Sequence, residues 1–144
     1  MDIREQEMNR VERLRQVHSE IERLAEEERM LARPTVTNMG MIRNLFDVFC
    51  LTLKYQDTES NPLDTNNRKK FLYAILYLFS PSTLAGQVMK HKMRRCVSDI
   101  IGCTPTGVSR DYKTSIFFYA TYSDFRNSVN NIIDNMLLVL GKYK

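Results

Sequence analysis

From Asp2 to Arg33 the chain contains no glycine and no proline, so no residue in this stretch interrupts a helix. Glu, Arg, Leu and Gln dominate it, and all four are good helix formers. Pro34 ends the run, because the residue before a proline is pushed out of helical geometry. The sequence therefore predicts one long helix over residues 1–33.

A narrow apolar seam follows one side of this predicted helix. With Leu14 at heptad position a, the following d and a positions hold apolar residues as far as Leu24. Glu28 then occupies the next a position, and the d position after it holds Leu31. The register is regular for about two heptads, fewer than the roughly three or four of a firm coiled coil. Such a seam needs a partner helix. We expect a second copy of the chain, in a dimer or a higher homo-oligomer; a helix of the same chain is the alternative.

The remaining residues predict a second helical domain over residues 39–144. Five glycines and four prolines among 144 residues are too few for a loop-rich all-β chain. Beyond a linker at residues 34–38, apolar residues recur with helical spacing in stretches that begin near Met41, Phe71 and Phe125. The aromatic and β-branched residues at 116–121 leave a short strand open as an alternative to helix.

The segment from Arg94 to Lys113 predicts two helices joined by a tight turn. The first helix stops at Gly102, since a left-handed turn residue is most easily a glycine. Thr104 suits the N-cap of the second helix, and Pro105 suits its first position. The solvent face of that second helix is predicted to display small, hydroxyl and basic residues: Thr106, Gly107, Ser109, Arg110 and Lys113.

A known family shares this pattern, which consists of an apolar residue, a small residue, a turn glycine and then apolar–Ser/Thr–Pro–x–Thr–Val–Ser–Arg. Here Val97, Ser98, Gly102 and the run CTPTGVSR at residues 103–110 occupy those positions. The segment thus resembles the helix-turn-helix of bacterial and phage transcription regulators, which implies that residues 104–113 begin a recognition helix. Ser98 replaces the usual Ala. Gly107 stands where Thr is common. A glycine there lowers the stability of the helix by roughly 1 kcal/mol and removes a base or phosphate contact.

A looser likeness covers residues 68–137. The runs FLYAILYLFSPSTLAG and IFFYATYSDFRNSVNNII are similar to short uncharacterised helix-turn-helix proteins of gut-bacterial phages and mobile elements. This likeness implies no particular activity. The predicted fold class is therefore all-α: a long N-terminal helix, with a possible coiled coil, followed by a helical bundle that contains a helix-turn-helix at residues 94–113.

Charge is distributed unevenly along the chain. Residues 1–33 carry seven Arg and nine acidic residues, whereas residues 66–95 carry no Asp or Glu. That second stretch holds seven cationic side chains: Arg68, Lys69, Lys70, Lys90, Lys92, Arg94 and Arg95. Such a stretch produces a field attractive to polyanions, although a merely solvated basic face is the alternative.

Together these patterns predict binding to double-stranded DNA. The residues expected to contact the groove and its flanks are Thr104, Thr106, Ser109, Arg110 and Lys113. The residues expected to hold the phosphate backbone are Lys90, Lys92, Arg94 and Arg95. In a dimer, the two recognition helices should lie about 34 Å apart to meet successive major grooves.

The function expected from the sequence is that of a non-enzymatic DNA-binding protein, a transcription regulator of a phage or mobile element. Two alternatives remain: a small DNA-recognition subunit of a phage packaging motor, and an oligomeric assembly or scaffold protein. In the assembly alternative, Arg110 is paired with an acidic side chain and the second helix of the motif packs against another chain.

Catalytic, metal-binding and targeting patterns are not recognisable in the sequence. The run GCTPTGVS has the two glycines of a phosphate-binding loop, but Val108 occupies the position of the essential Lys. His91, Cys96 and Cys103 lack the close paired spacing of a zinc site. We therefore expect no cofactor and no metal. Three unpaired cysteines, a charged N-terminus and short apolar runs favour a cytoplasmic protein without a membrane span.

Overall fold

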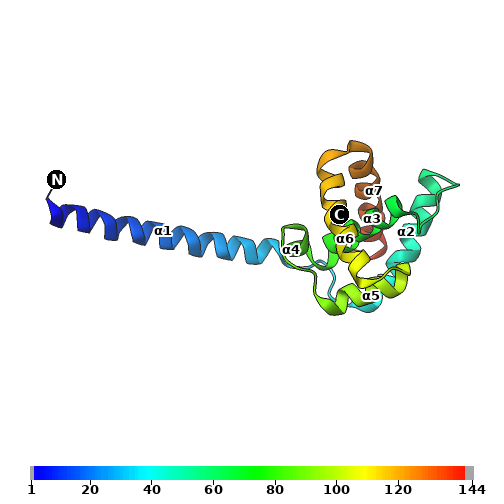
Figure 1. The fold of residues 1–144 in the computed structure, drawn as a ribbon, viewed down its shortest axis with the longest axis horizontal. Helices are drawn as coiled ribbons and strands as arrows, with labels where there is room; N and C mark the ends of the chain where they lie inside the picture. The colour runs from blue at the N-terminus through cyan, green and yellow to red at the C-terminus, as the bar shows by residue number, and fades with distance from the viewer. Residues whose placement is uncertain (1, 142–144) are drawn as a thin grey trace. The chain divides into compact units, whose positions relative to one another are not determined.

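The protein is all-helical in a computed structural model that describes residues 2–141 (Figure 1). No strand occurs within these residues, so the predicted fold class is confirmed. The chain divides into two units, one that ends at Arg33 and one that begins at Pro34. The last three residues of the predicted domain 39–144 lie outside the described residues.

The first unit is the single continuous helix α1 (Ile3–Leu31) (Figure 1). Asp2 caps its start, because the carboxylate accepts a hydrogen bond from the backbone N–H of Arg4 at 2.8 Å. Ion pairs within the helix join side chains three or four residues apart; Arg23, for example, contacts both Glu20 and Glu27. None of the residues of α1 is buried. Local propensity, capping and these pairs therefore account for the helix, and packing does not.

The second unit is a bundle built around helix α3. Its elements are η1 (Met39–Met41), α2 (Ile42–Gln56), α3 (Thr65–Phe79), α4 (Pro81–Leu84), α5 (His91–Ile101), α6 (Pro105–Thr121) and α7 (Ser123–Val139) (Figure 1). Helix α3 packs against α6 and α7, α2 packs against α7, and α5 packs against α6 and α2. The buried side chains of α3 are mostly apolar and lie on most sides of the helix, as expected for a helix enclosed by its neighbours.

Aromatic side chains join α2 to α3 in the core. Phe71 of α3 lies with its ring centroid 5.1 Å from that of Phe46 and 5.2 Å from that of Phe49. Phe49 and Phe71 are fully buried. Edge-on and tilted ring pairs at these distances stabilise a core beyond the area they bury.

Residues 116–121 are helical, so the alternative of a strand there is wrong. Helix α6 continues to Thr121, and the backbone N–H of Tyr122 still donates to the carbonyl of Phe118 at 2.8 Å. Tertiary packing overrides the local β preference: the ring of Tyr119 stacks on Tyr73 of α3 at a centroid distance of 4.1 Å. Burial raises the pKa of Tyr73 to about 12, and the neighbouring Tyr119 adds to the shift.

Within residues 2–141, none of the helices is both long enough and apolar enough to cross a membrane.

Candidate nucleic-acid interface

The turn between α5 and α6 is closed by Ser98 and Gly102. Gly102 has the left-handed conformation, with φ of 69°, and its N–H donates to the carbonyl of Ser98 at 2.9 Å. The backbone N–H of Cys103 donates to the same carbonyl at 3.2 Å, and the Ser98 hydroxyl donates back to the carbonyl of Cys103. The small residue of the motif therefore forms a hydrogen bond across the turn that the usual Ala could not form.

Helix α6 begins at a threonine cap. The hydroxyl oxygen of Thr104 accepts a hydrogen bond from the backbone N–H of Gly107 at 3.0 Å, and Pro105 occupies the first helical position. Gly107 is buried. A Cβ added there would lie 3.2 Å from the Thr104 hydroxyl and 3.5 Å from the sulfur of Cys103. The prediction that Gly107 is displayed to solvent, where a Thr would contact DNA, is thus wrong: this residue faces the turn.

Replacing Thr104 with alanine is expected to lower the free energy of unfolding by about 1 kcal/mol, because the N–H of Gly107 loses its cap. Urea denaturation followed by circular dichroism measures the change. The matched control is Thr106→Ala, since Thr106 is exposed and its side chain does not cap the helix. Equal losses in both variants would contradict this role of Thr104.

One face of α6 is exposed along its length. Thr106, Arg110, Lys113 and Phe117 follow one another at spacings of four, three and four residues, which places them on one helix face. All four are exposed, and 76% of the Arg110 side chain is accessible. The ion pair of Arg110 among the described residues is a long contact of 3.9 Å with its neighbour Asp111. The guanidinium is therefore accessible for an external anion.

Arg94 and Ser109, both predicted to contact DNA, are instead hydrogen-bonded to each other. Arg94 of α5 is half-buried; its Nη1 donates to the hydroxyl of Ser109 on α6 at 3.2 Å, and its Nη2 lies 3.2 Å from Nδ1 of His91. This link fixes α5 against α6.

The other cations at the start of α5 are exposed: Lys90, Lys92 and Arg95. We call Thr106, Arg110 and Lys113 of α6, together with Lys90, Lys92 and Arg95, the α5–α6 face.

An ion pair between a buried carboxylate and a half-buried guanidinium, which the sequence analysis missed, supports this face from beneath. Asp111 of α6 has a side chain only 3% exposed, and its Oδ2 lies 3.6 Å from Nη2 of Arg68 on α3. That oxygen has no hydrogen-bond partner among the described residues. Asp111 follows Val108 by three residues and directly precedes Tyr112, so the pattern already placed it on the buried face.

The cations at the start of α3 contribute less to an external field than the sequence predicted. Arg68 is balanced by Asp111, and Nζ of Lys69 lies 5.5 Å from the ring centroid of Phe118. Lys70 is half-buried; burial lowers its pKa, while the carboxylate of Asp64 acts in the opposite direction. The exposed positive charge of residues 66–95 therefore lies mainly at the start of α5.

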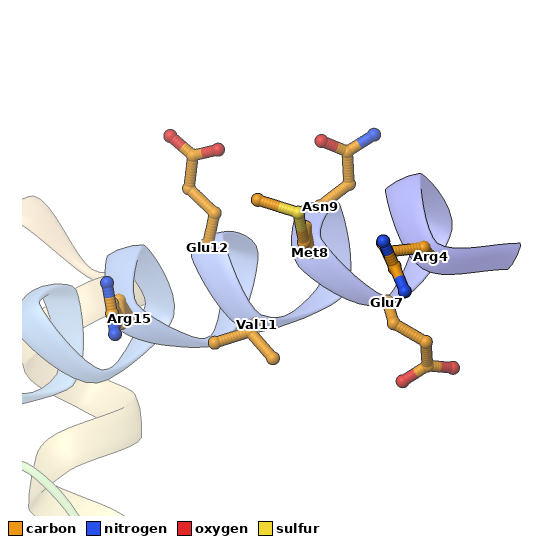
Figure 2. A pocket seen from close by; sticks show the side chains of 7 residues that line it. All are labelled: Arg4, Glu7, Met8, Asn9, Val11, Glu12 and Arg15. Atoms are coloured by element: carbon orange, nitrogen blue, oxygen red, sulfur yellow. The ribbon is translucent and has the colours of Figure 1, made fainter. Parts of the chain in front are cut away.

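A surface hollow lies along α1 (Figure 2). Its walls are seven side chains of α1 alone: Arg4, Glu7, Met8, Asn9, Val11, Glu12 and Arg15. Side chains of one helix cannot enclose a ligand, so this hollow is not a small-molecule site. No cluster of three His, Cys, Asp or Glu residues suited to a metal ion occurs within residues 2–141.

No family model matches the chain, and no curated protein or solved structure matches it significantly. The geometry of the α5–α6 face is therefore the basis for the function proposed below.

Proposed function

We propose that this protein binds double-stranded DNA through the α5–α6 face, as a non-enzymatic helix-turn-helix protein. The observation that carries the proposal is the succession of helix, left-handed glycine and helix, with exposed hydroxyl and basic side chains on the second helix. The resemblance of residues 97–110 to bacterial and phage transcription regulators supports it. A regulator of a phage or mobile element, acting in the cytoplasm, is the specific role we propose.

The chemistry of the face suits a duplex. The major groove of B-DNA admits an α-helix, and the exposed side of α6 would enter it. Arg110 can donate two hydrogen bonds to a guanine edge or a phosphate, and Lys113 supplies a cation one turn further on. Lys90, Lys92 and Arg95 would hold the adjacent phosphates, as the helix before the recognition helix does in such motifs.

The apolar seam of α1 supports a homo-oligomer, and we propose a dimer. Two linked copies would place two recognition helices on one duplex, about 34 Å apart if they occupy successive turns of the major groove. Dimerisation would also raise the affinity for paired half-sites, because the second binding event becomes intramolecular.

Binding to mixed-sequence duplex DNA at two salt concentrations tests the proposal. Five exposed cations on the face, each releasing counterions, would give a log–log slope of about −4.5, or a loss of roughly 500-fold between 50 and 200 mM salt. Fluorescence anisotropy of a labelled duplex measures the slope. No binding at 50 mM salt would contradict the proposal and favour the alternative of an assembly protein.

A further inference from the structure

We propose that α1 pairs with α1 of a second copy in antiparallel orientation, in the register that places Leu14 opposite the partner's Leu24. This inference rests on the dimer proposed above and adds its orientation and register. It arises from the order of apolar and charged side chains along the exposed seam of α1.

The centre of the seam is apolar and uncovered. Leu14, Val17, Ile21 and Leu24 are between 37% and 61% exposed. In an antiparallel coiled coil, position a of one helix faces position d of the other. The proposed register gives four consecutive apolar layers, in which Leu14 faces the partner's Leu24 and Val17 faces the partner's Ile21, each twice by symmetry.

The charged residues that flank this centre decide the orientation. Arg10 lies at position d before the apolar layers, and Glu28 lies at position a after them. In the antiparallel register Arg10 faces the partner's Glu28 at both ends of the seam. In a parallel dimer two Arg10 side chains would face each other, as would two Glu28 side chains, and both contacts are repulsive. Among the ion pairs of residues 2–141, Glu28 takes part in none, so its carboxylate is available. Arg10 contacts Glu7 of its own helix, an exposed pair of little stability that Arg10 would share with, or exchange for, the partner's Glu28.

The positions beside the seam agree with this orientation. Arg13 lies near the partner's Glu27 on one edge, and Val11, which does not fit the a and d pattern, lies near the partner's Ala25 on the other. The same register brings two Glu20 side chains together, but each already forms an ion pair within its own helix, with Arg23 at 2.8 Å. The corresponding edge pairs of a parallel dimer join no Arg to a Glu.

The antiparallel pair has a consequence for DNA binding. At 1.5 Å per residue, the two C-terminal ends of α1, at Leu31, would lie about 36 Å apart along the coil axis. The two copies of the second unit would leave the coil at opposite ends, each after a short linker. That separation is compatible with recognition helices spaced about 34 Å apart.

Charge exchange in the full-length protein tests the orientation. Glu28→Arg is expected to weaken dimerisation at least about tenfold in Kd, because two attractive layers become repulsive. Arg10→Glu should act similarly, and the double variant Arg10→Glu with Glu28→Arg should restore the wild-type Kd in sedimentation equilibrium. Glu12→Arg, on the outer face of the coil, makes the same charge change and should leave Kd unaltered. If Glu28→Arg dimerises as tightly as the wild type, the antiparallel register is wrong.

A distance measurement separates this inference from the dimer on which it rests. Spin labels on Glu5→Cys, in a full-length variant without the three native cysteines and with the dimer Kd verified, should give a separation of about 42 Å by pulsed electron resonance. A dimer with labels within about 20 Å would overturn the antiparallel orientation and leave the proposed dimer intact. A monomer throughout the micromolar range would overturn both, while the DNA titration would still test the α5–α6 face independently.

Discussion

Replacing Arg68 with methionine is expected to destabilise the second unit by about 3 kcal/mol, the lower end of the usual effect of removing one partner of a buried ion pair, because the Arg68 side chain is 24% exposed. The carboxylate of Asp111 would remain buried, 3% exposed, without its cation on α3. Arg110, whose Nε lies 3.9 Å from the other carboxylate oxygen, is too exposed to replace it. Urea denaturation of the full-length variant measures the loss.

Removing both charges should reverse most of that loss. In the double variant Arg68→Met with Asp111→Leu, no charge is left without a partner, and apolar residues of similar size often replace a buried pair at little cost. We expect the free energy of unfolding to return to within about 1.5 kcal/mol of the wild type. The matched control is Lys54→Met, an exposed cation of α2, for which a change within about 0.5 kcal/mol is expected. A double variant as unstable as Arg68→Met would contradict the ion-pair explanation.

The elements that could be predicted from the sequence are those with local signals. The long helix, predicted to reach residue 33, ends at Leu31, just before the residues that Pro34 constrains. The turn at Gly102 follows from a glycine before a Thr–Pro start. Each of these features depends on residues within a turn or two of chain. The same holds for the exposed stripe of α6, because the positions of Val108 and Tyr112 determine which side faces the core.

Features that depend on contacts between distant segments could not be predicted in this way. A count of cations in residues 66–95 does not reveal that Arg68 meets a carboxylate on another helix. The aromatic run after Lys113 has the local composition of a strand, but the stacking of Tyr119 on α3 keeps it helical. The family pattern likewise treats Gly107 as an outward position, whereas its close approach to the Thr104 cap turns it inward.

The double substitution Arg110→Ala with Lys113→Ala is expected to weaken duplex binding by about 2–4 kcal/mol, roughly 30- to 1,000-fold in Kd. Both side chains are exposed on the side of α6 that would enter the major groove. Each phosphate contact that is lost should also reduce the magnitude of the salt slope by about 0.9. A loss of affinity without the full change in slope would therefore indicate that Arg110 contacts a base edge rather than a phosphate. Anisotropy titrations at several salt concentrations give both quantities.

Two comparisons make this prediction specific to the α5–α6 face. Arg43→Ala with Lys54→Ala removes the same charge from exposed positions of α2 and should leave affinity and slope nearly unchanged, because neither residue belongs to the face. Lys92→Ala with Arg95→Ala should reduce the magnitude of the salt slope by about 1.8. The sequence preference should not change, since phosphate contacts carry no sequence information. If binding remains salt-sensitive but is unaffected by the substitutions of Arg110 and Lys113, only the start of α5 contacts DNA, and α6 is not a recognition helix.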